Sequence, residues 1–165
     1  MNTGDFQATD EQAQDEAIRQ AIELLFFAYR DFTGEADDIL QHYGFGRAHH
    51  RVIYFVGRNA GISVNQLLAI LKITKQSLAR VLGQLIDEGF VEQRTDEQDR
   101  RCRLMTLSAT GKRLERQLTA AQSRRISRAY QNVGAEAVQG FRLILRQIIN
   151  EEDQERVAGF FDPEA

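Results

Sequence analysis

The apolar positions between residues 63 and 88 predict two short helices separated by a tight turn. In the first helix, apolar residues recur at the three- and four-residue spacing of one helical face, at Val64, Leu67, Leu68 and Leu71. Ser63 and Gln66 have the S-x-x-Q spacing of a capping box, which marks the start of this helix. Thr74 is a good N-cap for the second helix, which we expect to end at Glu88.

The second predicted helix has two chemically different faces. The apolar face must pack on the core, and it consists of Leu78, Val81, Leu82, Leu85 and Ile86. The opposite face is polar or small, and it consists of Lys75, Gln76, Ala79, Arg80, Gly83 and Gln84. Glutamine pairs with adenine edges and arginine or lysine with guanine edges, so this face has the chemistry of base recognition. The alternative, a face that only meets solvent, is disfavoured by the segment that follows.

Two strand patterns follow, at Phe90–Arg94 and Cys102–Leu107. Polar and apolar residues alternate in the second strand except at Met105, as shown by Arg103, Leu104, Thr106 and Leu107. The segment between the strands is too polar for a core, so we expect it to form the tip of a hairpin. A hairpin after two helices predicts a winged helix-turn-helix, which usually places one helix in the major groove of DNA.

The predicted hairpin tip, Thr95–Arg101, is rich in charge. Arg100 and Arg101, presented on a thin hairpin, can enter the narrow, electronegative minor groove. Asp99 is unsuited to a phosphate contact, so we interpret it as a carboxylate that orients Arg101 by a charge-assisted pair. The alternative for Asp99 is an ordinary surface charge.

These residues resemble the MarR family of bacterial transcription regulators. The resemblance rests on the helix pair Ser63–Glu88, on EGFVEQR at Glu88–Arg94, on D-x-x-D-R-R at Asp96–Arg101 and on L-S-x-x-G at Leu107–Gly111. The family usually has proline where this chain has Glu97 and threonine where it has Ser108, and both differences are mild. The segment Gly46–Asn59 further resembles a PetP-like sub-branch of the family.

The resemblance implies a mainly α-helical fold with a small β-hairpin wing, in which residues 1–165 form a single MarR-type domain. It implies an obligate homodimer whose dimerisation helices, at about 10–45 and 134–165, interlock between subunits. It assigns about 46–110 to the winged-helix DNA-binding region and 108–133 to a linking helix. It also implies that a small molecule or an oxidant often releases the protein from its operator.

The periodicity outside the winged region predicts further helices. A long helix over about Asp10–Phe32 is apolar nearly all round, which favours burial against a partner chain. The alternative is a core helix within one chain. Shorter helices over Glu35–Tyr43 and Arg47–Asn59 follow. A helix capped by Ser108 is interrupted at Gly134, and a final amphipathic helix comes after it.

The charge distribution suits double-stranded DNA, although the net charge of the chain is −3. Residues 1–45 carry two basic and ten acidic side chains, residues 46–128 carry 16 basic and seven acidic, and residues 129–165 carry three basic and seven acidic. Salt screens charges beyond about 8–10 Å, so phosphate binding depends on the local field. The basic middle of the chain therefore favours contact with DNA.

Composition also narrows the expected cellular compartment of the protein and the kinds of chemical site that it can form. Apolar runs are too short for a transmembrane helix, and the acidic first residues lack a secretory pattern, so we expect a cytoplasmic protein without membrane contact. One cysteine, Cys102, excludes an intrachain disulfide and a cysteine-rich zinc site. The sequence has no glycine-rich phosphate loop, nucleophile motif or apolar carboxylate pair, so we expect no enzymatic activity and no cofactor.

The expected DNA contacts divide by chemistry. Lys75, Gln76 and Arg80 are the expected base readers, and Thr74 and Ser77 are anchors at the helix N-terminus. The further candidates are Gln84, Asp99, Arg100 and Arg101. A homodimer of such readers binds half-sites about 34–36 Å apart, so we expect the operator to be a pseudo-palindrome.

Aromatic and cationic side chains lie close to the boundary between the first predicted helices and the winged region, and they suggest an effector site. The family resemblance implies a ligand pocket there, and the candidate residues are Tyr29, Arg30, His42, Tyr43, His49 and Arg51. This mixture suits a small aromatic or anionic compound. Zinc is an alternative, held by His42, His49 and His50 with Asp37 or Asp38. No metal-binding motif supports zinc, so we expect no metal site.

Two further functions stay open. The arginines around Cys102 would make its thiol more reactive, so the wing could sense oxidants. However, the peroxide-sensing branch of the MarR family has its cysteine in the N-terminal helix, where this chain has none. The second alternative is a winged-helix module that binds protein. Such a module needs exposed Leu, Phe or Tyr on the outer helix face, which this sequence does not provide.

Overall fold

A computed structural model describes the backbone of residues 3–161 and the side chains of residues 12–157. The chain divides into two compact units, unit 1 up to residue 123 and unit 2 from residue 124 onward. The predicted domain extends beyond the described residues at both ends. The predicted mainly α-helical fold with a small sheet is confirmed.

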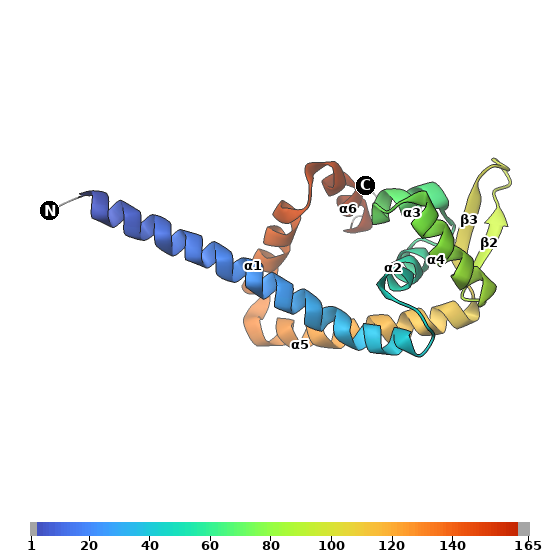
Figure 1. Cartoon of the computed structure of the whole chain (residues 1–165), viewed down its shortest axis with the longest axis horizontal. Coiled ribbons are helices and arrows are strands. Elements are labelled where there is room, and N and C mark those ends of the chain that lie inside the picture. The colour runs from blue at the N-terminus through green and yellow to red at the C-terminus, as the bar shows by residue number, and fades with distance from the viewer. Residues whose placement is uncertain (1–2, 162–165) are drawn as a thin grey trace. The chain divides into compact units, whose positions relative to one another are not determined.

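The described residues form nine elements in chain order (Figure 1). They are α1 (Thr3–Gln41), α2 (Arg47–Arg58), β1 (Ile62–Ser63), α3 (Val64–Leu71), α4 (Lys75–Asp87), β2 (Val91–Thr95), β3 (Arg103–Leu107), α5 (Ala109–Ile148) and α6 (Glu151–Phe161). The helix-turn-helix is α3 and α4, and the hairpin of β2 and β3 is the wing.

α1 is one continuous helix, so the predicted separation of two helices around Gly34 is wrong. A glycine inside a helix costs about 1 kcal/mol relative to alanine, which neighbouring contacts can outweigh. The Thr33 hydroxyl donates a hydrogen bond to the Tyr29 carbonyl oxygen at 3.1 Å, within the helix. Ala36 and Leu40 on the following turns are fully buried in the core of unit 1. Packing of these turns therefore keeps the helix intact.

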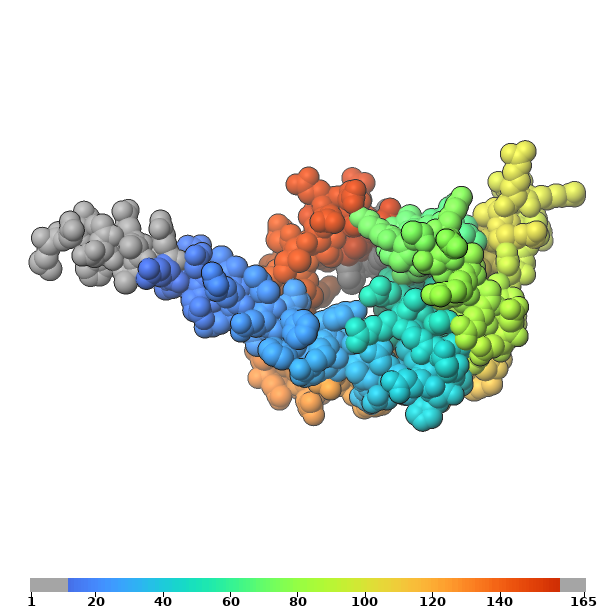
Figure 2. Space-filling view, viewed as in Figure 1, coloured from blue at the N-terminus to red at the C-terminus, as the bar shows by residue number. Residues whose placement is uncertain are grey.

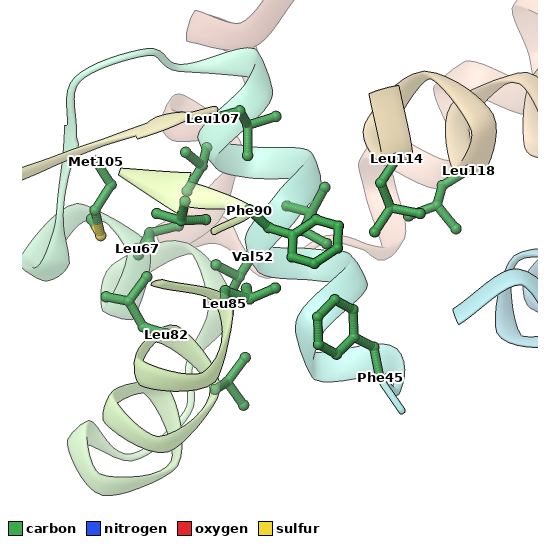
Figure 3. Close-up of a cluster of buried hydrophobic side chains, with 14 of the residues drawn as sticks. Phe45, Val52, Leu67, Leu82, Leu85, Phe90, Met105, Leu107, Leu114 and Leu118 are labelled. Atoms are coloured by element: carbon green, nitrogen blue, oxygen red, sulfur yellow. The ribbon is translucent and has the colours of Figure 1, made fainter. Parts of the chain in front are cut away.

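α2 lies in the middle of the unit 1 core (Figure 3). Its side chains Val52, Ile53 and Val56 are fully buried. The other helices and the strands of unit 1 also contribute to this core, and its residues include Leu40, Phe45, Ile62, Leu67, Leu78, Leu85, Phe90, Val91, Met105, Leu114 and Leu118. Each such side chain contributes about 1.5–3 kcal/mol by leaving water. The winged region therefore has an apolar core that includes the last turns of α1.

The sheet contains three antiparallel strands in the order β1–β3–β2. β1 has only two residues, too few for a periodic signal, and it was not predicted. It is held by the pairing of Ile62 with Met105 and of Ser63 with Leu104. Met105, which interrupts the expected alternation, is fully buried and shares the core face of β3 with Leu107.

The caps of the helix-turn-helix follow the prediction. The Ser63 N–H donates to Gln66 Oε1 at 2.8 Å, and the Gln66 N–H donates to Ser63 Oγ at 3.2 Å. This reciprocal pair is the expected capping box. Lys72 adopts a left-handed conformation in the turn, with φ of 49°. α4 ends with Glu88 as its C-cap, and Gly89 follows with φ of +75°.

The start and the interruption of α5 are also confirmed. The Ser108 Oγ accepts the Gly111 N–H at 3.0 Å and donates to the Gly89 carbonyl oxygen at 2.6 Å. The side chain therefore caps α5 and ties it to the end of the helix-turn-helix. Gly134 has φ of 79° and ψ of 167°, which interrupts the helical backbone as predicted.

Large apolar side chains remain exposed on α1 and in unit 2. On α1 they are Ile18, Ile22, Leu24, Leu25, Phe26 and Phe27. In unit 2 they are Val133, Phe141, Leu143, Ile144 and Ile148. Exposed apolar surface gathered in this way marks sites of association. Within residues 3–161, no helix combines the length and the apolar character needed to cross a bilayer.

Substitution of Gly111 tests the contact between α5 and the end of the helix-turn-helix. A Cβ added there would lie 2.0 Å from the Phe90 carbonyl oxygen, a backbone atom that cannot rotate away. We expect Gly111→Ala to lower the free energy of unfolding by about 1–3 kcal/mol, measured by urea denaturation. Gly83→Ala is the control, because a Cβ there meets nothing within 4 Å. Equal unfolding midpoints for the two variants would contradict the close approach.

Candidate nucleic-acid interface

The N-terminus of α4 is built around Thr74. The Thr74 Oγ1 accepts the Ser77 backbone N–H at 3.1 Å, and the Thr74 hydroxyl donates to Ser77 Oγ at 2.9 Å. The N-cap role predicted for Thr74 is confirmed, and both side chains are exposed. The helix dipole and the free N–H groups of the first turn make such an end attractive to an anion.

The outward face of α4 is polar along its first two turns. Lys75, Gln76 and Arg80 are exposed, with the small Ala79 between them. On the opposite face the predicted core residues Leu78, Val81, Leu82 and Leu85 are buried. Figure 2 shows α4 in green at the surface of unit 1, next to the yellow wing. The three long polar side chains are therefore presented by a helix that the core holds in place.

Gln84 lies in a different environment from the rest of the outward face. Its side chain is half-buried, and Oε1 lies 2.9 Å from His49 Nε2 of α2. Its Nε2 donates to Glu88 Oε1 at 2.9 Å. The sequence groups Gln84 with the DNA-facing residues, whereas the structure engages both polar atoms of its side chain in contacts within the chain.

The wing extends from the body of unit 1 (Figures 1 and 2). At its tip the Asp99 Oδ1 accepts the Arg101 backbone N–H at 2.9 Å, and the Asp96 Oδ1 accepts the Gln98 N–H at 3.0 Å. Asp99 thus contacts the main chain of Arg101, and this contact differs from the predicted pair with the guanidinium. The turn presents Arg100 and Arg101 as exposed side chains.

Cys102 closes the turn through its backbone. Its N–H donates to the Asp99 carbonyl oxygen at 2.8 Å, and its carbonyl oxygen accepts the Asp96 N–H at 3.1 Å. The side chain is half-buried and is not in a disulfide. The Arg103 guanidinium donates to the Thr95 hydroxyl across the two strands. Oxidant sensing by Cys102 stays a prediction.

Two of the candidate effector residues meet where α1 lies against α2. The Arg51 Nη2 donates to Tyr29 Oη at 3.1 Å, and the Arg47 guanidinium lies 5.8 Å from the centroid of the Tyr29 ring. The Arg47 Nε donates to Asp37 Oδ2 at 2.8 Å. This hydrogen bond and the negative charge of Asp37 raise the pKa of Arg47. Two guanidinium groups of α2 therefore lie near one phenol ring.

The other effector candidates are not part of this group. Arg30 pairs with Asp31 at 2.8 Å and lies over the Phe27 ring at 4.9 Å. The His42 Nδ1 makes a 2.8 Å hydrogen bond with the Asp38 carbonyl oxygen within α1. A second group forms around Phe45, which stacks on the rings of both Tyr43 and His49. The six predicted residues thus lie in several separate environments.

The three histidines do not form a metal site in the described part of the chain. No group of three or more His, Cys, Asp or Glu side chains there is arranged to hold a metal ion. Burial lowers the pKa of His50; the charge of Asp37 opposes this shift and that of Arg51 adds to it. The arrangement of these side chains, as far as the structure describes them, lends no support to the zinc alternative.

Sequence reasoning missed Arg47 beside Tyr29 and the contact between His49 and Gln84. The four-residue spacing of Arg47 and Arg51 could have placed them on one helix face. No local pattern could have indicated the other pair, which lies 35 positions apart in the sequence.

Comparison with known proteins gives a family assignment. A sequence model described as the MarR family matches residues 43–101. The chain is 47% identical over 136 residues to the HTH-type transcriptional regulator PetP of Rhodobacter capsulatus, and the match covers 82% of each chain. This match extends well beyond the segment that the family model covers.

Solved structures support the same assignment. A MarR transcriptional regulator from Methanosarcina mazei Go1 is 26% identical, with a TM-score of 0.62 over 80% of this chain and 96% of that one. A mutant MarR from E. coli complexed with operator DNA is 19% identical and has the same fold, with a TM-score of 0.63 over 81% of this chain and 96% of that one. The chain therefore belongs to the MarR family of transcription regulators, in its PetP-like branch.

Proposed function

We propose that two copies of this chain bind a pseudo-palindromic operator, each with α4 in a major groove and the wing in the adjacent minor groove. One observation carries this proposal: a capped helix exposes Lys75, Gln76 and Arg80 beside a hairpin that exposes Arg100 and Arg101. An α-helix fits the major groove, and arginines on a thin hairpin fit the narrow minor groove. The mutant MarR from E. coli, solved with operator DNA, agrees with DNA as the partner.

Each exposed group on α4 has its own role in this proposal. Arg80 pairs with a guanine edge and Gln76 with an adenine edge, while Lys75 contacts a further guanine. Ser77 contacts a phosphate at the positive end of the helix, and Thr74 orients the Ser77 hydroxyl for that contact. The hydrogen bond from Thr74 already occupies one acceptor position of Ser77 Oγ, so the Ser77 proton can turn toward a phosphate oxygen. Phosphate contacts set the register and base contacts supply specificity.

The charge distribution favours this surface. Residues 46–128, which contain the winged region, carry 16 basic and seven acidic side chains. The acidic excess is in the first 45 and the last 37 residues, outside the winged region. The local positive field attracts the DNA backbone despite the negative net charge.

The exposed apolar surface supports the proposed homodimer. On α1, Ile22 is 64% exposed and Leu24 is 69% exposed, with further apolar side chains around the same helix. Leaving such residues in water forgoes about 1.5–3 kcal/mol for each, which association recovers. Residues of about 10–45 and 134–165 are the dimerisation helices in this proposal.

A small aromatic anion is the proposed effector. Arg47 and Arg51 provide two guanidinium groups beside the Tyr29 ring, which suits a carboxylate attached to an aromatic ring. α1 carries Tyr29 on the same helix as the buried Leu40. A ligand bound at Tyr29 therefore acts on a helix that is packed into the core of the DNA-reading unit.

A protein-binding role for α4 has less support. Its exposed side chains include no large apolar group among residues 75–87, all of which the structure describes. Interfaces between proteins are enriched in aromatic anchors, which this surface lacks. DNA binding is therefore the function that this surface supports best, in agreement with the MarR family of transcription regulators.

Replacement of Arg80 and Arg101 by alanine tests the two DNA contacts separately. Arg80→Ala should weaken binding by about 1–3 kcal/mol and relax specificity at one base pair, because a bidentate base contact is lost. Arg101→Ala should weaken binding most at A·T-rich flanks, where the minor groove is narrow. Affinity is measured by fluorescence anisotropy, using the duplex that the wild-type protein selects from sheared genomic DNA at about 0.15 M salt.

Arg116→Ala is the matched control, since Arg116 is an exposed arginine of α5 outside the proposed interface. It removes the same charge and should change the affinity by no more than about twofold. If Arg80→Ala and Arg101→Ala both bind as tightly as the wild type, another surface contacts DNA.

Lysine substitutions on α1 test the dimer. Ile22→Lys places a charge in the exposed apolar surface, whereas Gln20→Lys places the same charge beside Glu16, which Gln20 already contacts. The wild type and Gln20→Lys should elute at twice the chain mass of 18.8 kDa in size exclusion with light scattering. Ile22→Lys should shift toward the single-chain mass, because burying an unpaired ammonium is unfavourable. If the wild type elutes at the single-chain mass, the proposed dimer is wrong.

Titration of the protein–DNA complex with benzoate and with phenol tests the effector site. Millimolar benzoate should weaken binding of the selected duplex more than phenol, because only benzoate carries a carboxylate for the two guanidinium groups. Arg51→Met should abolish this response. Arg30→Met should keep it, since Arg30 pairs locally with Asp31. If neither benzoate nor phenol changes the affinity of the wild type for the duplex, the effector hypothesis is wrong.

A further inference from the structure

Three consecutive hydrogen bonds connect the start of α2 with the end of α4. The Gly46 N–H donates to His49 Nδ1 at 3.1 Å. The His49 Nε2 lies 2.9 Å from Gln84 Oε1, and the Gln84 Nε2 donates to Glu88 Oε1 at 2.9 Å. His49 belongs to α2 and Gln84 to α4, so the middle hydrogen bond joins two separate helices.

The chemistry of the donors determines the direction of these hydrogen bonds. A backbone N–H can only donate, so the Nδ1 of His49 is an acceptor and the ring proton is on Nε2. That N–H donates to Gln84 Oε1, which turns the amide nitrogen of Gln84 toward Glu88. Both polar atoms of the half-buried Gln84 side chain are therefore engaged within the protein.

Aromatic packing holds the His49 ring in this orientation. Phe45 stacks on His49 with centroids 4.8 Å apart and an interplanar angle of 10°. Phe45 is only 5% exposed, and its ring meets that of Phe90 edge-on at 5.1 Å (Figure 3). The imidazole is thus held by the core, and it offers one directed N–H to α4.

We propose that His49 is a positioning residue for DNA recognition, which acts through Gln84 to set the rotation of α4 on α2. The proposal rests on the proposed function of α4 as the operator reader. Apolar contacts between helices are non-directional, whereas a hydrogen bond weakens steeply as its angle departs from linear. A small rotation of α4 about its axis would displace Lys75, Gln76 and Arg80 relative to the bases. In this assignment Gln84 positions α4 and does not contact the bases.

Two conservative substitutions separate the two hydrogen bonds of His49. Glutamine can place an amide nitrogen near the position of Nε2, so His49→Gln keeps the donor to Gln84 and loses the acceptor for Gly46. Asparagine can place an amide oxygen near the position of Nδ1, so His49→Asn keeps the acceptor for Gly46 and loses the contact with Gln84. If His49 only caps α2, His49→Asn should preserve the affinity for DNA. If His49 positions α4, His49→Gln should preserve it.

The affinity of each full-length variant is measured for the duplex selected by the wild type, together with its thermal unfolding midpoint. His49→Asn and Gln84→Met should each bind roughly two- to tenfold more weakly, as expected for one lost hydrogen bond. His49→Gln should stay within about twofold of the wild type. The double variant His49→Asn with Gln84→Met should bind no more weakly than either single variant, because both changes remove the same contact.

Three results would overturn the positioning role of His49. They are wild-type affinity in His49→Asn, equal weakening in His49→Gln and His49→Asn, and additive losses in the double variant. Gln84→Met tests the same contact from α4 without disturbing the cap of α2. It therefore keeps the test valid if a His49 variant fails to fold.

Arg80→Ala separates the positioning role of His49 from the proposed function of α4. If Arg80→Ala also binds as the wild type does, the function proposed for α4 fails; if Arg80→Ala alone weakens binding, only the positioning role fails.

Discussion

The burial of one face of α2 is the packing interaction on which the DNA-reading unit depends. Val52, Ile53 and Val56 have no exposed surface, and α2 contacts α1, α3, α4 and β3. At about 1.5–3 kcal/mol for each buried side chain, this packing exceeds what single polar contacts contribute. Apolar packing turns the buried face of α4 toward α2, but it is poorly directional and leaves small rotations of the helix unconstrained. We propose that the hydrogen bond between His49 and Gln84 limits these small rotations.

Apolar packing and directed polar contacts also act together in the exposed parts of the unit, α4 and the wing. Helical periodicity places the apolar stripe of α4 in the core, and the residues left outside are those with base-reading chemistry. In the wing, Asp99 accepts a backbone N–H and shapes the turn, which leaves the guanidinium of Arg101 exposed. Ser108 ties the start of α5 to Gly89 at the end of the helix-turn-helix. Polar contacts within the unit therefore position the groups that we propose to meet DNA.

α1 connects two proposed functions of the chain within one element. Its exposed apolar part, which includes Ile22 and Leu24, is the proposed dimer surface. Its last turns bury Leu40 in the core of the DNA-reading unit. Tyr29, with the two arginines of α2 beside it, lies between these parts. A continuous helix transmits displacement along its length, which gives a physical basis for control of DNA binding by dimer geometry or by a ligand.

The sequence by itself determined the features whose causes are local. The cap at Thr74, the interruption at Gly134 and the two faces of α4 all depend on residues within a few positions of each other, and the wing joins two strands that are close in the sequence. Tertiary structure alone decided that α1 continues through Gly34, because buried neighbours outweigh a weak local preference. It also decided that the two residues of β1 form a strand, through pairing with β3. The contact of His49 with Gln84 joins positions far apart in the sequence, so only folding could bring the two side chains together.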